Sequence, residues 1–292
     1  MTQAPDAETS DRSPPIASVA PVARLILDGY KRYSATTDED VLLDCVRRLP
    51  AKTRARFLLT PAGFIDFSWP ANWVGHSGWQ SRETDLVPLI RAAEQAVHEA
   101  VTPAVCKAAL DVVDYLVLGA DGAAGRGWPY AQMVAIYDVR AERIVHWSGK
   151  SFPTSTQEGD LVQFLPVDSH AAILGEDRVL LLDCHDLAVF SPYGAATSRR
   201  LERQTRRAEM RQLVSTFGPT LVLHLTHTMD TLRTWRDSWN ELRSLAPTIR
   251  SWATGILYYR DGNPPRQSLE VVLEGSSYPR RAELDVLTGW AD

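Results

Sequence analysis

Apolar positions in the first third of the chain recur every three to four residues, which is the spacing of one face of an α-helix. This spacing predicts helices at residues 22–33, 37–49, 83–100 and 103–110. Two short apolar runs around Pro61-Ala62-Gly63 instead predict a hairpin over 56–69. We therefore expect a mostly helical N-terminal region over residues 18–104. It follows a polar tail over 1–17 whose composition is typical of disorder.

From residue 111 onward, short apolar runs alternate with helical patterns. The expected strands are 115–118, 131–137, 143–147, 178–183, 220–225, 252–259 and 268–273, and the expected helices are 156–165, 197–215 and 231–244. Three strands followed by β-α-β units predict a mixed sheet with helices packed on it. The predicted fold class is therefore α/β, a mixed sheet with flanking helices, and its main domain covers residues 105–292.

Composition narrows the class of protein. The 292 residues have a formal net charge of -5, which argues against a surface that is basic overall but leaves room for a local basic patch. Because every apolar run is too short to span a bilayer, we expect no membrane partner. Three cysteines without paired spacing, and an N-terminus unlike a secretory signal, predict a reduced, cytoplasmic protein.

Polar side chains gather where three of the predicted strands end. They are Asp121, Asp183, Asp186, His224, His227 and Asp230. Because the carboxyl ends of such strands meet at one edge of a sheet, we expect a site there. Carboxylates and imidazoles bind divalent metal, so we expect Asp121, Asp186, Asp230 and His224 to hold Mg²⁺ or Mn²⁺, with zinc less favoured.

Two residues of this set are candidates for the catalytic step itself. A metal-activated water needs a group that positions or deprotonates it, and His227 and Asp183 are the candidates for that role. For the other residues there is a simpler interpretation. Asp186 and Asp230 cap the helices that follow them, and His224 is a hydrogen-bonded core residue.

Cys184 lies among these acidic residues. The simplest interpretation is a small buried hydrophobic side chain. The alternatives are a thiolate ligand for zinc beside His224 or His227, and a nucleophile paired with a nearby histidine. Lys150 lies in a Gly-Lys-Ser sequence that lacks the leading glycine of a phosphate-binding loop, so we expect it on the exposed surface.

The most basic stretch of the chain predicts a stripe of arginines on one helix, Arg199, Arg203, Arg206 and Arg207. Arg203 and Arg207 are candidate contacts to a phosphate of nucleic acid or a nucleotide. A solvated helix face is the alternative. The tryptophan-rich loop 69–79 offers either a surface that packs on the sheet or an anchor for a protein partner.

Residues 114–230 resemble a ribonuclease H-like domain. Asp121-Gly122, with Gly125, Gly127 and Trp128 nearby, is similar to the turn that ends the first strand of that fold. The resemblance implies acidic ligands at Glu158 or Asp160 and at Asp183 or Asp186, with His227 and Asp230 after the fifth strand. It also implies two-metal cleavage of a phosphodiester.

A second resemblance is to the metallo-β-lactamase fold, because residues 179–259 look like the late strands of its DNA-uptake branch. This resemblance implies metal roles for Asp186 and His224. The main His-x-His-x-Asp-His motif is missing, since the corresponding strand end is Gly119-Ala120-Asp121-Gly122. It therefore implies a two-zinc site that is largely lost.

The leading functional hypothesis from the sequence is a metal-dependent hydrolase, either a nuclease or a phosphodiesterase. Two alternatives stay open. One is a non-catalytic, partner-binding subunit of a multi-protein system, and the other is a cysteine-dependent enzyme that uses Cys184.

Overall fold

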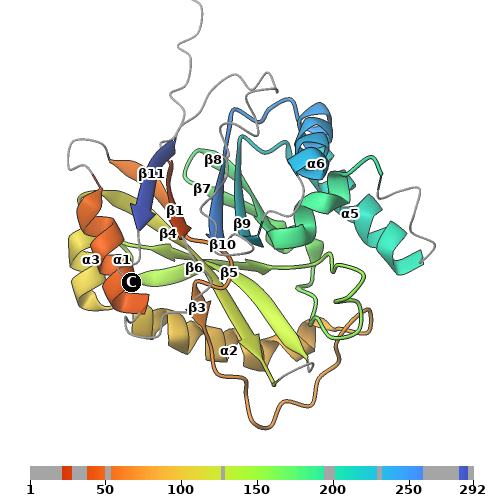
Figure 1. Cartoon of the computed structure of the whole chain (residues 1–292), viewed down its shortest axis with the longest axis horizontal. Helices are drawn as coiled ribbons and strands as arrows, with labels where there is room; N and C mark the ends of the chain where they lie inside the picture. Colours follow the sequence, from red (N-terminus) through yellow and green to blue (C-terminus); the bar gives the residue numbers. More distant parts are fainter. Residues whose placement is uncertain are drawn as a thin grey trace, which may run out of the picture.

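The computed structural model describes residues 22–27, 38–49, 54–125, 129–193, 201–228, 232–258 and 283–288. In these residues the strands form one sheet in the order β6-β5-β4-β2-β1-β10-β9-β8-β7, with β11 paired to β1 and β3 paired to β4 (Figure 1). The strands are β1 (Val22–Leu27), β2 (Ala55–Leu59), β3 (Ile65–Asp66), β4 (Val113–Ala123), β5 (Tyr130–Asp138), β6 (Arg143–Gly149), β7 (Ala171–Leu174), β8 (Asp177–Asp183), β9 (Leu221–Thr228), β10 (Ser251–Tyr258) and β11 (Glu283–Thr288). The helices are α1 (Asp38–Arg48), α2 (Glu83–Ala100), α3 (Pro103–Ala109), α5 (Leu201–Phe217) and α6 (Leu232–Leu245), with 3₁₀ helices η1 (Val167–His170) and η2 (Cys184–Phe190).

The predicted α/β fold class is confirmed. The sheet is mixed, because β8, β9 and β10 pair in parallel while β4, β5 and β6 form an antiparallel meander. The helices flank this sheet on both sides (Figure 1). None of the described helices combines the length and the apolar character needed to cross a bilayer.

The two halves of the sheet face each other across an apolar layer. Alternate residues of a strand point to opposite faces. Val179 and Leu181 of β8 join one buried cluster with Val117 of β4 and Val134 of β5, although these strands lie far apart in the order of the sheet. The sheet therefore folds over on itself, and one face of each half points into the space between the halves.

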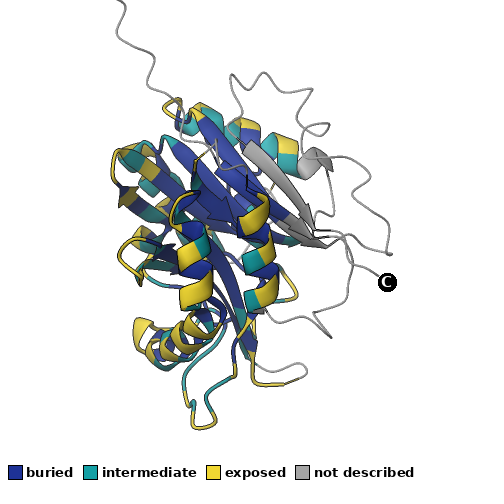
Figure 2. Cartoon of the chain, turned by 90° about the vertical axis from the view of Figure 1, so that its left-hand side faces the viewer, coloured by how far each residue is buried: buried dark blue, intermediate teal, exposed yellow. Residues whose placement is uncertain are grey.

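Helices cover the outer faces of both halves. Leu180 and Leu182 of β8 pack in a second cluster with α5 and α6, while Leu116 and Leu118 of β4 pack in a third cluster with α1, α2 and α3. Figure 2 shows the buried strands inside and the exposed faces of the helices outside. Because β8 is buried on both faces, its sequence is a continuous apolar run instead of an alternating one.

Several predicted elements differ from the structure. Residues 22–27 form strand β1 instead of a helix, because this segment pairs with β2, β10 and β11 and its residues 22–25 are buried. The hairpin over 56–69 is wrong, since β2 and β3 both pair in parallel with β4. The helix over 156–165 is replaced by turns and by isolated bridges at Leu161 and Val162. The strand expected at 268–273 lies outside the described residues.

The sheet crosses the expected domain boundary near residue 105. Strands β1 and β2 come from the segment expected to be mostly helical, yet they lie in the middle of the strand order, between β4 and β10. The segment before residue 105 therefore contributes to the same sheet as the rest of the described chain.

Candidate functional site

Four polar side chains point into one end of the layer between the two halves of the sheet. Asp121 is four residues after the inward-facing Val117 in β4, and Asp183 is two residues after the inward-facing Leu181 in β8. By the same alternation, Gln132 of β5 and His227 of β9 face inward as well. The fold-over of the sheet is therefore what brings these residues together.

Cys184 lies at this end, where β8 turns sharply into η2. Its backbone has a φ of 41°, in the left-handed region that non-glycine residues seldom adopt. The His224 ring donates a hydrogen bond from Nε2 to the Cys184 carbonyl oxygen at 2.8 Å, which holds the turn. Strained backbone of this kind is often found at functional sites, and Cys184 is partly accessible to solvent.

His227 forms an ion pair with Asp121, with 2.7 Å between His227 Nε2 and Asp121 Oδ2. The Gln132 amide lies beside this pair and donates from Nε2 to Asp121 Oδ2 at 3.3 Å. Lys150 follows β6, is fully buried, and donates from Nζ to Gln132 Oε1 at 2.8 Å. One amide thus links a buried ammonium group to the carboxylate that orients His227.

These charges determine the protonation state of the Cys184 thiol. Burial raises its pKa, but the Lys150 ammonium and a hydrogen bond with His227 outweigh burial and lower the pKa to about 6. Burial also lowers the pKa of His227, whereas Asp121 and Cys184 together raise it well above its usual value. At neutral pH the site therefore holds a thiolate next to an imidazolium.

The backbone approaches the ion pair closely at Gly63, where φ is +63°. A Cβ atom at this position would lie 2.9 Å from His227 Nε2 and 3.1 Å from Asp121 Oδ2. Glycine is therefore required both by the left-handed conformation and by the space next to the pair.

Asp186 is a structural residue behind the site. Its carboxylate accepts hydrogen bonds from the backbone N–H groups of Ser151 at 3.1 Å, Phe152 at 2.8 Å and Asp183 at 3.1 Å. It thereby ties the segment after Lys150 to the turn that carries Cys184. Asp186 does not cap a helix that follows it: it lies at the third position of η2 and accepts from the N–H of the N-cap residue Asp183 in a capping box.

The remaining sequence candidates occupy other positions. His224 is fully buried against Trp235 and Trp239, and burial lowers its pKa to about 4, so it is neutral. Arg203 pairs with Glu158 at 2.7 Å and lies 4.4 Å from the ring centre of Phe152. These contacts make His224 and Arg203 parts of the packed structure.

Arg207 donates to the Ser191 carbonyl oxygen at 2.7 Å, so it too has an internal partner. Asp230 and Arg199 lie outside the described residues. In the loop 69–79, Trp69 and Trp73 contact each other with ring centres 5.0 Å apart and pack on the apolar cluster of α1, α2 and α3. This is the packing role that the sequence allowed for this loop.

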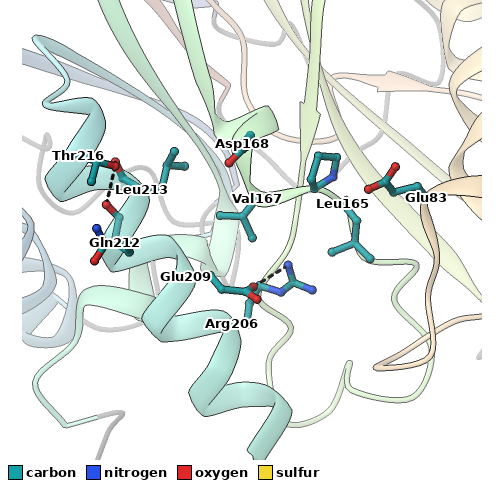
Figure 3. A pocket seen from close by; sticks show the side chains of 10 residues that line it. Glu83, Leu165, Val167, Asp168, Arg206, Glu209, Gln212, Leu213 and Thr216 are labelled. Atoms are coloured by element: carbon teal, nitrogen blue, oxygen red, sulfur yellow. Dashed lines mark hydrogen bonds and ion pairs between the residues drawn. The ribbon is translucent and has the colours of Figure 1, made fainter.

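A pocket of about 520 Å³ lies elsewhere, between α5 and residues 165–168 (Figure 3). Its lining includes the ion pair of Arg206 and Glu209, together with Asp168 and Leu213. It contains neither Cys184 nor any of the charged residues next to that thiol, so it is separate from the candidate site.

In comparisons with known proteins, this chain is similar to solved structures only. No protein-family model and no curated protein matches the chain. A mutant amidase from Nesterenkonia sp. AN1 with acrylamide added to its active-site cysteine is 17% identical. The match covers 80% of this chain and 78% of that one, with a TM-score of 0.47. Another mutant of the Nesterenkonia AN1 amidase, from the nitrilase superfamily, is 16% identical over 80% and 77% of the two chains, with a TM-score of 0.47.

The two family resemblances expected from the sequence are wrong. The solved structures similar to this chain are nitrilase-superfamily amidases, not ribonuclease H-like or metallo-β-lactamase proteins. The sheet also separates the relevant strands, because β2, β1, β10 and β9 lie between β4, which carries Asp121, and β8, which carries Asp183. These residues meet across the folded sheet and not along one edge of it.

The predicted metal-dependent nuclease and its Mg²⁺ or Mn²⁺ site are also wrong. No three His, Cys, Asp or Glu side chains of the described residues are arranged to hold a metal ion. The expected ligands have other partners: Asp121 pairs with His227, Asp186 accepts backbone N–H groups, and His224 donates to a carbonyl oxygen. One of the similar amidases carries acrylamide added to its active-site cysteine.

Sequence reasoning missed Gln132, Gly63 and the buried position of Lys150. Gln132 had a visible signal, since it is a polar residue at an inward position of the otherwise apolar strand Tyr130–Asp138. Lys150 had none, because its burial depends on how the two halves of the sheet meet.

Proposed function

We propose that this protein is a cysteine-dependent hydrolase that transfers an acyl group to Cys184 and then to water. The observation that carries the proposal is the Cys184 thiol, with its pKa lowered to about 6 at a strained strand end beside Lys150 and the His227–Asp121 pair. A thiolate is the nucleophilic form of cysteine, and a nearby histidine is its usual acid–base partner. The proposal therefore takes up the cysteine alternative from the sequence.

In the first step, the Cys184 sulfur attacks the carbonyl carbon of the substrate, and the carbonyl π electrons move to oxygen. When the carbonyl re-forms, the bond from carbon to the leaving nitrogen or oxygen breaks. The His227 imidazolium gives its proton to that leaving atom. The products of this step are a thioester on Cys184, a released amine or alcohol, and a neutral His227.

In the second step, water attacks the thioester carbon while neutral His227 takes one of its protons. The carbon–sulfur bond then breaks, which releases a carboxylic acid and restores the thiolate and the imidazolium. Asp121 orients His227 through the 2.7 Å contact and favours its protonated form. The buried Lys150 ammonium offsets negative charge as it moves from sulfur to the substrate oxygen.

We also propose a cytoplasmic location for the protein. Support comes from the three free cysteines and from a mechanism that needs a reduced thiol. Fractionation of cells that produce the native chain, followed by immunodetection, tests this location.

The experiment that tests the function is a hydrolysis screen with p-nitrophenyl esters and p-nitroanilides of short acyl groups. We expect turnover of at least one compound by the wild-type protein and none by Cys184→Ala. Cys106→Ser is the matched control, because Cys106 is a buried thiol in α3, outside the candidate site. Equal turnover by wild type and Cys184→Ala would refute the proposal.

A further inference from the structure

Two polar groups near Cys184 lack hydrogen-bond partners. Asp183 is only 1% exposed, and neither of its carboxyl oxygens meets hydrogen-bond geometry with a partner among the described residues, although the backbone N–H of Asp186 faces this carboxyl group in a capping box. The Tyr130 hydroxyl is also buried and has no partner in the same part of the chain. Buried polar groups in native proteins are nearly always hydrogen-bonded, so these two groups, which lie near Asp121 Oδ1, itself without a hydrogen bond among the described residues, call for a physical reason.

Both groups belong to the layer in which the thiol lies. Asp183 directly precedes Cys184 and faces inward from β8. Tyr130 is two residues before Gln132 on β5 and therefore faces inward too. Burial raises the pKa of Tyr130, and the charges of Asp160, Asp121 and Cys184 raise it further, so this hydroxyl stays protonated.

The surroundings of Asp183 disfavour a charge on its carboxyl group. An ionised carboxylate at this position would be buried with only the backbone N–H of Asp186 facing it among the described residues, and without a hydrogen bond to it. The negative charges of Asp121 and Cys184 would disfavour this carboxylate. The positive charges of His227 and Lys150 would favour it. Burial and these negative neighbours raise the pKa of Asp183 well above its usual value.

A protonated carboxyl group is a hydrogen-bond donor, as is a phenol. We propose that Asp183 is an uncharged carboxylic acid in the resting site and that it and the Tyr130 hydroxyl donate hydrogen bonds to an acceptor oxygen of the acyl group that enters beside Cys184. This inference rests on the proposed function, because it assigns two substrate-binding donors to the same site. It accounts for both unpaired groups by giving them one common ligand.

The charge state is tested with iodoacetamide, by following alkylation of Cys184 across pH and measuring the Cys184 peptide by mass spectrometry. For Asp183→Asn we expect the same half-maximal pH as in wild type, because an uncharged group replaces an uncharged group. A shift of about one pH unit or more toward acid would overturn the inference, since removing a negative charge next to a thiol lowers the pKa of that thiol.

Two further variants calibrate this measurement. Asp121→Asn removes a charge that keeps His227 protonated, so we expect it to raise the pKa of Cys184 and move the profile toward alkaline pH. Asp111→Asn is the matched control, because Asp111 is exposed in the turn before β4 and we expect no shift.

The donor role is tested by comparing two reagents. Iodoacetamide has a carbonyl oxygen that accepts hydrogen bonds, whereas dimethyl disulfide reacts with a thiolate and has no oxygen. We expect Tyr130→Phe and Asp183→Leu to lower the ratio of the iodoacetamide rate to the disulfide rate by about five- to tenfold each, the effect of one hydrogen bond. Unchanged ratios in Tyr130→Phe, whose ring keeps its shape, would overturn the donor role even if Asp183→Leu fails to fold.

Failure of this inference differs from failure of the proposed function. The function fails if wild-type Cys184 itself reacts with the pH profile of an ordinary thiol. The inference fails on the variants relative to wild type, whatever the position of the wild-type profile.

Discussion

Replacing Lys150 by methionine removes the positive charge that contributes most to lowering the pKa of Cys184. Methionine fills a similar volume without a charge, so the buried position stays occupied. The replacement also deletes the donor that Gln132 Oε1 accepts at 2.8 Å. We expect the thiol to become a weaker acid while the protein remains folded.

The size of this effect follows from the structure. The pKa of Cys184 is lowered from 9.0 to about 6, although burial alone raises it. An opposite charge close to an ionisable group shifts its pKa by about 1 to 3 units, so loss of Lys150 is expected to place the Cys184 pKa at about 7 to 9. At pH 6.5 the thiolate fraction then falls from about three quarters to between about one quarter and one three-hundredth, which slows alkylation by about 3- to 240-fold.

The assay is the rate of Cys184 alkylation by iodoacetamide at pH 6.5 and at pH 9.5, with the modified peptide measured by mass spectrometry. We expect the slower reaction of Lys150→Met at pH 6.5 and nearly equal rates at pH 9.5, where both thiols are ionised. Lys107→Met is the matched control, because Lys107 is exposed on α3. Equal rates of Lys150→Met and wild type at pH 6.5 would refute the electrostatic reasoning.

Three other predictions concern the same site. Gly63→Ala should lower the free energy of unfolding by about 1 to 2 kcal/mol and slow turnover, because Gly63 has a φ of +63° and a Cβ there would lie 2.9 Å from His227 Nε2. Gly159→Ala is the control: a Cβ there has no neighbour, so denaturation and rate assays should show no change in the free energy of unfolding or in turnover. Asp186→Ala leaves three backbone N–H groups without their acceptor and should cost about 2 to 4 kcal/mol in urea unfolding, whereas exposed Asp168→Ala should cost less than about 0.5. Hydrolysis by wild type should rise with pH through about 6, as the Cys184 thiol ionises, and a pH–rate profile that rises only above pH 8 would contradict this.

The buried strands were predictable because their sequences are short apolar runs bounded by polar residues. The runs at 178–183 and 220–225 correspond to β8 and β9, since a strand covered on both faces needs apolar side chains at every position. The segment 22–27 was not predictable in this way. Its apolar spacing suits a helix as well as a strand, and pairing with β2, β10 and β11 decides between them.

The place of the candidate site was easier to predict than its chemistry. Asp121, Asp183 and His227 were expected to meet because each lies at a strand end, and the structure does bring them together. Their partners depend on contacts across the fold-over of the sheet, which local sequence does not encode. Lys150 illustrates this, because an isolated lysine in a polar segment is usually exposed, yet here it is fully buried beside Cys184.

The most direct test of the account is to look for the covalent intermediate. The wild-type protein is mixed with p-nitrophenyl acetate, quenched in acid within seconds, and analysed by intact and peptide mass spectrometry. The account predicts one added acetyl group, located on Cys184 and absent from Cys184→Ala. Release of p-nitrophenol by wild type with no acetyl group on Cys184 at any quench time, and at the same rate in Cys184→Ala, would contradict it.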